Sequence, residues 1–285
     1  MFRSKTAELE IEKTGGSSQP GGTMDVQIAI RPRKGMKVKT GQVELVCNEQ
    51  WWEKETPGDS GSGKLQTHSV LSQPLVQSFI ADTEISAAEP VVRYARFQIP
   101  KEVPPTVHGS VAQVSWQLSA RLEIENGNPI TVSQEVTVLT PQVVKAGRSV
   151  ASLSEEAIFT DCTLALVLVN DVVGAGGFLE GELRAKVNSP QQAKDVRMEL
   201  HSSESAGERE VESVRERVSL VANLQLNTSD EPYVWAFSLP VPAQTLPTVK
   251  SGHTAVSWRL KAVVDTEQTK EAYHLERDVQ VFTST

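Results

Sequence analysis

The 285-residue sequence has little of several features on which function often depends. It has no run of 18 or more apolar residues, so no segment is long enough to cross a bilayer as a helix. Its first residues lack the apolar core of a secretory signal. It has two cysteines, Cys47 and Cys162, and no CxxC pair, so neither a disulfide framework nor a cysteine metal site is indicated. We therefore expect a cytoplasmic protein with two buried thiols.

An excess of positive charge is also missing. The net charge is −8, and residues 1–150 are balanced, with 16 basic and 16 acidic side chains. Residues 151–285 carry 12 basic and 20 acidic side chains, which accounts for the whole excess. Nucleic-acid binding depends on basic patches that neutralise phosphates, so this balance argues against a nucleic-acid partner.

Groupings of catalytic or metal-binding residues are absent from the sequence. The five histidines are scattered, and none forms an HxH, HxxxH or HExxH pattern. An enzyme would need a nucleophile, a base or metal ligands that converge on one site, and the sequence offers no such set. We therefore expect no catalytic residue, no metal site and no cofactor.

One segment imitates two catalytic motifs without their context. Gly58 to Lys64 reads as GxxxxGK, but Leu65 follows the lysine where a phosphate-binding loop needs Ser or Thr. Gly58 to Gly61 also matches the nucleophile segment of trypsin-like proteases, but no histidine precedes Ser60 as the partner base. The glycine, serine and proline content of residues 53–68 instead predicts an irregular loop.

The sequence does contain an internal repeat, displaced by about 142 residues. The strongest copy is Val114 to Ala120, which recurs as Val256 to Ala262. Three shorter segments recur in the same order: Phe97–Pro100 as Phe237–Pro240, Pro105–Val107 as Pro247–Val249, and Val136–Leu139 as Val279–Phe282. A duplicated unit of about domain size predicts two domains of the same fold.

Within each unit the signals are those of strands. Apolar and polar residues alternate over Asp25–Ile30 and over Val114–Arg121, which is typical of half-buried strands. Asn126-Gly127 predicts a hairpin, and residues 210–220 favour a charged strand over a short helix. About seven strands per unit suit an all-β fold of two tandem antiparallel immunoglobulin-like β-sandwiches. We expect domains at residues 1–140 and 157–285, with a linker at 141–156.

Four tryptophans are the most informative aromatic residues. Trp116 and Trp258 lie at matching positions of the repeat on the apolar face of their strands, so we expect both in the cores. Trp51 and Trp52 are adjacent and must point to opposite faces of a strand. One of these rings is therefore either exposed, as a candidate anchor for a partner, or covered by the loop at 53–68.

The remaining candidate is a basic segment in an otherwise neutral or acidic chain. Residues 31–39 contain five basic side chains: Arg31, Arg33, Lys34, Lys37 and Lys39. Pro32 and Gly35 predict a strand end followed by a turn, where charged residues are common. The functional alternative is a contact with a protein partner, an anionic membrane or a phosphorylated ligand.

The order of these segments resembles the arrestin family, and the resemblance covers nearly the whole chain. Each arrestin unit contains a Phe-Pro-type strand, a Pro-Pro-Ser/Thr-like segment, a strand of the form V-x-W/Y-x-L/V-x-A and a return hairpin. The matching segments are Phe97–Pro100, Pro104–Thr106, Gly109–Leu122 and Ile130–Leu139, then Phe237–Pro240, Leu246–Thr248, Gly252–Val264 and Ala272–Phe282. In size the chain is similar to the bacterial sporulation-control arrestin-like proteins. It has no PPxY motif, and the family's phosphate sensor has no residue-by-residue match.

The resemblance implies a non-enzymatic adaptor or scaffold that binds protein partners at the inner face of a membrane. Such a sandwich protein would bind through sheet edges, through loops or through the groove between the sandwiches. The alternative is an extracellular sandwich for adhesion or ligand binding, which a signal peptide, disulfides or clustered exposed aromatics would favour. An enzyme is the third and least supported hypothesis.

Overall fold

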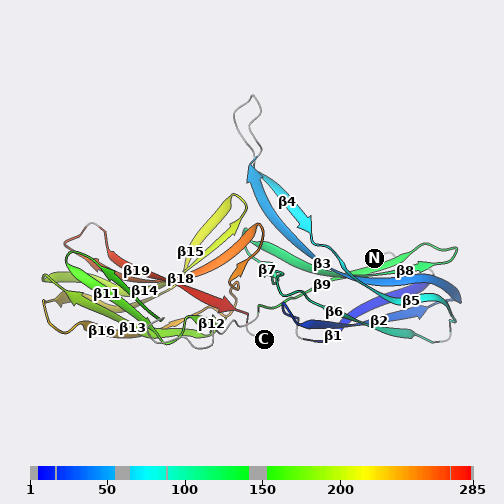
Figure 1. The fold of residues 1–285 in the computed structure, drawn as a ribbon, viewed down its shortest axis with the longest axis horizontal. Coiled ribbons are helices and arrows are strands. Elements are labelled where there is room, and N and C mark those ends of the chain that lie inside the picture. The colour runs from blue at the N-terminus through cyan, green and yellow to red at the C-terminus, as the bar shows by residue number, and fades with distance from the viewer. Residues whose placement is uncertain are drawn as a thin grey trace, which may run out of the picture.

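The computed structural model describes residues 6–16, 18–54, 65–87, 89–140, 153–269 and 271–283. Residues 6–140 are called the first half below, and residues 153–283 the second half. All regular structure in the described residues is β-strand, and none of them forms a helix that could cross a membrane. The strands form four sheets, consistent with two β-sandwich domains. Figure 1 shows the two halves end to end along the long axis of the molecule.

The first half contains a sheet of three strands and a sheet of six. Its strands are β1 Ala7–Gly15, β2 Thr23–Pro32, β3 Met36–Lys54, β4 Leu65–Leu71, β5 Leu75–Ile85, β6 Val91–Gln98, β7 Val107–His108, β8 Gln113–Ile124 and β9 Ile130–Val136. The small sheet has the order β1-β2-β6. In the large sheet β3 and β8 are central, β4 and β5 pair with different ends of β3, and β7 and β9 pair with β8.

The second half contains a sheet of four strands and a sheet of six. Its strands are β10 Ser154–Ile158, β11 Cys162–Leu168, β12 Val172–Gly174, β13 Phe178–Val187, β14 Gln191–Ala206, β15 Arg209–Leu226, β16 Tyr233–Pro240, β17 Val249–Lys250, β18 Thr254–Thr266 and β19 Tyr273–Phe282. The orders are β10-β11-β13-β16 and β12-β19-β18-β14-β15, with β17 beside β18. All pairs are antiparallel except β12 with β19.

The repeat predicted from the sequence is present in the hydrogen bonds as well as in the strands. Trp116 of β8 and Trp258 of β18 are 1% and 2% exposed, which confirms the prediction that both are core residues. Each indole Nε1 donates a hydrogen bond of 3.0 Å to a backbone carbonyl twelve residues earlier, that of Pro104 or Leu246. An indole needs a partner for its N–H when it is buried, and both halves provide it in the same way.

The turn preceding the equivalent strands β2 and β13 is also the same in both halves. Gly21 and Gly176 have φ angles of 79° and 81°, a region in which only glycine is free of strain. The next residue closes each turn, since Gly22 N donates to the Gln19 carbonyl at 2.8 Å and Gly177 N donates to the Gly174 carbonyl at 2.9 Å. The glycines that precede β2 and β13 therefore have the same conformational role in the two halves.

Several sequence predictions about single elements are confirmed, and others need correction. Residues 210–220 lie within strand β15, and Asn126-Gly127 forms the turn between β8 and β9. The strands are more numerous than seven per unit, because β3 takes two partner strands on one side and because short strands such as β7 and β17 pair with central ones. The predicted loop at 53–68 includes strand residues at both ends, and the motif Gly58–Lys64 lies outside the described residues.

The predicted linker is described only at its end. Residues 141–152 lie outside the described part, and residues 154–156 belong to strand β10, which pairs with β11. The predicted domain limits at 140 and 157 therefore stay a prediction.

Candidate functional site

The basic segment 31–39 is divided between the two sheets of the first half. Arg31 lies near the end of β2 in the small sheet, whereas Lys37 and Lys39 lie on β3 in the large sheet. All five basic side chains belong to exposed residues, at Arg31, Arg33, Lys34, Lys37 and Lys39. The segment is therefore solvent-accessible, but its charges spread over the end of the sandwich.

Three of these five charges have carboxylate partners. Arg31 Nη2 lies 3.0 Å from Glu10 Oε2, Arg33 Nη2 lies 3.8 Å from Glu8 Oε2, and Lys37 Nζ lies 3.0 Å from Glu125 Oε2. The hydrogen bond with Glu125 raises the pKa of Lys37 and outweighs the opposing effect of desolvation. Among the described residues no ion pair involves Lys34 or Lys39. The attraction for an anion is thus concentrated on two lysines.

Trp51 and Trp52, at the end of β3, lie against the second half of the chain. The Trp51 ring stacks on His253 with 3.8 Å between centroids and 7° between planes. The Trp52 ring faces the Arg209 guanidinium, whose carbon is 4.9 Å from the ring centroid. Both tryptophans are half-buried. The sequence predicted a ring that is either exposed to a partner or covered by the loop at 53–68. It did not predict that the rings would contact the other half of the chain.

Next to the tryptophans, two buried glutamates bridge the halves. Glu49 of β3 accepts hydrogen bonds from the hydroxyl of Ser251 and from the backbone N of His253 at 2.9 Å. Glu204 of β14 accepts from Ser110 N at 2.6 Å and from Val111 N at 3.2 Å through its Oε2 atom. A buried carboxylate is costly unless hydrogen bonds replace its water, and here the opposite half provides them.

The two glutamates are equivalent positions of the repeat. Glu49 pairs with Val114 in β8, and Glu204 pairs with Val256 in β18, and these two valines match in the sequence repeat. Each glutamate reaches the loop that precedes the matching central strand of the other half. We call these two sets of bonds the reciprocal carboxylate contacts. They give the interface between the halves an approximate twofold relation, as in a symmetric dimer.

The reciprocal carboxylate contacts are not identical. Glu204 also accepts from Arg215 Nη2 at 3.3 Å, and Arg215 Nε donates to Ser202 Oγ at 2.7 Å. In addition, a β-carbon at Gly109 would overlap the Oε2 atom of Glu204, so a side chain at this position would displace the carboxylate. In the equivalent loop, a β-carbon at Gly252 would come no closer than 3.9 Å to Glu49.

A cavity of about 500 Å³ opens beside Glu204. Its walls come from both halves and include His108 and Ser110 on one side and Glu204, Arg215, Thr245 and Leu246 on the other. The two charged groups on its second wall are already paired with each other. The cavity is therefore a polar hollow between the halves with no net charge from this pair.

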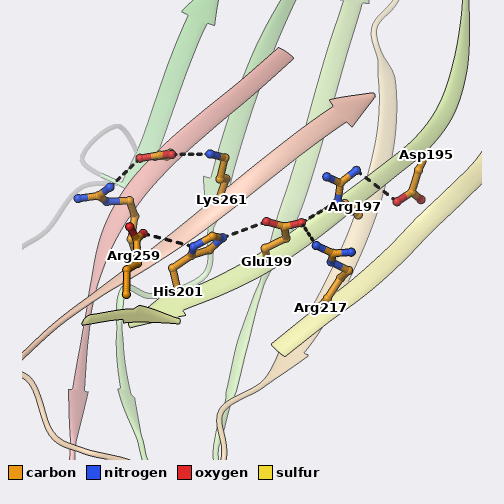
Figure 2. A network of polar contacts seen from close by, with 9 residues as sticks. Asp195, Arg197, Glu199, His201, Arg217, Arg259 and Lys261 are labelled. Carbon is orange, nitrogen blue, oxygen red and sulfur yellow. Dashed lines mark hydrogen bonds and ion pairs between the residues drawn. The ribbon is translucent and has the colours of Figure 1, made fainter. Parts of the chain in front are cut away.

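A second polar cluster covers the outer face of the large sheet of the second half (Figure 2). Along β14, Arg197, Glu199 and His201 alternate with buried apolar residues, so they share one face. Glu199 Oε1 lies 2.7 Å from Arg197 Nε and 2.8 Å from Arg217 Nη2, and its Oε2 lies 2.9 Å from His201 Nε2. Glu199 is the centre of this network, with three cationic or hydrogen-bonding partners.

Burial opposes the ionisation of Glu199, but the hydrogen bonds from Arg197 and His201 outweigh it and lower the pKa of the carboxyl to about 2. On the neighbouring strands of the same sheet, Glu276 lies 3.0 Å from Arg259 Nη1 and 2.9 Å from Lys261 Nζ. Carboxylates whose pKa is lowered by several cationic partners are poorly suited to proton transfer near neutral pH. The cluster is best understood as ion pairing that joins neighbouring strands.

The sequence predictions did not include Glu49, Glu204 or Glu199, although a signal for them exists. Glu44-Leu45 followed by Glu49 recurs as Glu199-Leu200 followed by Glu204, at a spacing of 155 residues. This spacing differs from the 142 residues of the main repeat, because the two units contain insertions of different length. An acidic residue repeated within an alternating apolar strand indicates a carboxylate with a structural role.

Both thiols are buried and unpaired, as expected from the sequence. Desolvation raises the pKa of Cys47 and of Cys162 to about 12. The described residues also contain no group of three or more His, Cys, Asp or Glu side chains placed to bind a metal ion. Comparison with known proteins matches no family model and no curated relative, so the comparisons assign the chain to no family.

Proposed function

We propose that this chain is a non-enzymatic adaptor or scaffold that binds protein partners in the cytoplasm, near the inner face of a membrane. In this proposal the two halves are tandem immunoglobulin-like sandwiches of the arrestin type. The resemblance in the sequence motifs supports the family, and the repeated tryptophan and glycine hydrogen bonds support a duplicated sandwich.

The observation that carries the proposal is the pair of reciprocal carboxylate contacts. Two independent domains on a linker would leave their facing surfaces hydrated, whereas here buried glutamates from each half bond to the other. Such bonds, together with the stacking of Trp51 on His253, fix the halves in one orientation. A fixed pair of sandwiches presents several sheet edges and loops in a constant arrangement, which is what a scaffold requires.

Affinity capture from host-cell extract tests the proposal. The native chain is compared with a variant in which Arg31, Arg33, Lys34, Lys37 and Lys39 are replaced by Glu, with quantification by mass spectrometry. We expect at least one protein that is specifically and reproducibly enriched by the native chain. Loss of that protein with the variant would place its contact on the basic segment, and retention would remove the segment from the site. The absence of any specific protein with the native chain would contradict the adaptor function.

A further inference from the structure

The free edge of β16, at the border of the four-stranded sheet, differs from most of the other exposed edges. β16 pairs over all eight of its residues with β13 and ends the sheet order, so one side of its backbone has no partner strand among the described residues. An unpaired edge exposes N–H and C=O groups that an added strand can bind. Natural proteins usually protect such an edge with charged side chains.

β16 lacks that protection. Its sequence, Tyr233 to Pro240, contains no Asp, Glu, Lys or Arg, whereas charged residues occur in the edge strands β1, β5, β6, β9, β10 and β15. Strand β4 is the other edge strand of this length whose sequence contains none of these four residue types. The lack of charge is therefore unusual among the edge strands of five or more residues.

The internal repeat provides a direct comparison, since β6 is the equivalent strand of the first half. There Arg93 and Arg96 occupy the positions of Tyr233 and Ala236 in the second half. Both arginines are exposed, and Arg96 is bound to Asp25 on the neighbouring strand at 2.5 Å. The same duplicated edge is thus charged in one half and uncharged in the other.

The surroundings of β16 indicate the chemistry of a partner. Asp230 and Glu231 are exposed just before the strand begins, and Glu180 is exposed on β13 beside Ser238, near its other end. In the described residues none of these three carboxylates forms an ion pair. Between the two acidic ends, Tyr233 and Trp235 are half-buried and stack on each other with 5.9 Å between centroids. The edge therefore combines an apolar centre with negative charge at both ends.

We propose that the free edge of β16 binds an extended segment of a partner protein, with alternating apolar residues at its centre and Lys or Arg at its ends. The added strand would continue the sheet through main-chain hydrogen bonds, and its basic ends would meet the three carboxylates. Pro232 and Pro240 limit the segment to the length of the strand. A second copy of the chain fits less well, because antiparallel pairing of β16 with itself would bring the acidic ends together.

A synthetic peptide tests this assignment on the full-length chain. The peptide alternates valine and threonine at its centre, carries two lysines at each end and bears a fluorescent label. Affinity is measured by fluorescence anisotropy, and the bound edge is located by amide hydrogen exchange. Two control peptides replace the lysines by glutamates or carry N-methyl groups on alternate backbone amides.

Ala236→Arg is the matched variant, because it copies Arg96 of β6 onto an exposed position of β16. The second variant, Tyr94→Arg, adds the same charge to β6 and is the control. We expect the peptide to slow exchange in residues 233–239, and its affinity to fall by about tenfold or more in Ala236→Arg while Tyr94→Arg is unchanged. Both control peptides should bind more weakly.

The assignment is overturned if no peptide binding is detected or if the peptide slows exchange at another edge. It is also overturned if the N-methylated peptide binds as well as its parent. Self-association of the chain through β16 without added peptide would overturn it too. The inference rests on the adaptor function, and the capture experiment separates the two. A partner recovered equally by the native chain and Ala236→Arg would overturn the role of β16 and leave the adaptor intact. Recovery of no partner by either would overturn the adaptor itself.

Discussion

At the scale of single residues, Trp116 and Trp258 show how closely the two halves share their packing. Each ring is enclosed in a core and each indole N–H is bound to a backbone carbonyl at 3.0 Å. Replacement of either by Ala would leave a cavity and an unpaired carbonyl.

We therefore expect Trp116→Ala and Trp258→Ala each to lower the free energy of unfolding by about 3–5 kcal/mol. Urea unfolding followed by circular dichroism measures this, and Trp52→Ala, at a half-buried position, is the control with a smaller effect. Unchanged unfolding curves for both core variants would disprove the shared core role.

Glu199 makes stability depend on pH in a defined direction. Its folded-state pKa of about 2 lies below the ordinary value for glutamate, so folding favours the ionised form. That contribution is complete above about pH 5 and is lost as the pH falls towards 2.

We expect Glu199→Gln to cost roughly 2–3 kcal/mol at pH 7, and the difference from the native chain to shrink to about half at pH 3. Glu212→Gln is the matched control, because Glu212 also pairs with His201, at 3.4 Å, but is an exposed carboxylate whereas Glu199 is buried. A difference that stays constant between the two pH values would mean that the network does not stabilise the Glu199 anion.

At the scale of elements, the loops before β8 and β18 carry the contact between the halves. Gly109 lies so close to Glu204 that a methyl group would displace the carboxylate, whereas a methyl group at Gly252 in the equivalent loop would make only ordinary van der Waals contact with Glu49. The duplicated loops thus offer one sensitive and one tolerant position for the same substitution.

Gly109→Ala should lower the free energy of unfolding by about 1–3 kcal/mol, since a buried carboxylate loses its hydrogen bonds. Gly252→Ala should change it by less than about 0.5 kcal/mol. Thermal unfolding by calorimetry gives both values, and equal effects of the two substitutions would contradict the close contact at Glu204.

The elements also show what can be predicted from the sequence and what cannot. Alternating residues and turn signals sufficed for the all-β fold, for the hairpin at Asn126 and for the core positions of Trp116 and Trp258, because these depend on local periodicity. The role of Trp51 could not be deduced, since its partner His253 is about two hundred residues away in the sequence. For the same reason, the carbonyl and amide partners of Glu49 and Glu204 become visible only in the folded chain.

At the scale of the whole molecule, duplication accounts for the interface as well as for the domains. Equivalent glutamates on equivalent strands reach equivalent loops, so the same kind of contact is made twice across the interface. Two differences between the copies then distinguish the halves. Arg215 lies beside Glu204 in the second half, and the edge of β16 is uncharged whereas the equivalent edge of β6 is charged. The proposed adaptor uses the shared features for rigidity and the differences for binding.

The central claim is that the reciprocal carboxylate contacts hold the halves in one orientation. Electron paramagnetic resonance distance measurement tests it most directly, with spin labels at Thr131→Cys and Lys186→Cys, two exposed positions in different halves. The buried Cys47 and Cys162, whose pKa is raised to about 12, should remain unlabelled. We predict a single narrow distance distribution that broadens when Glu49→Gln and Glu204→Gln are combined. A broad distribution in the chain with both glutamates intact, or a narrow one that the double substitution leaves unchanged, would contradict the claim.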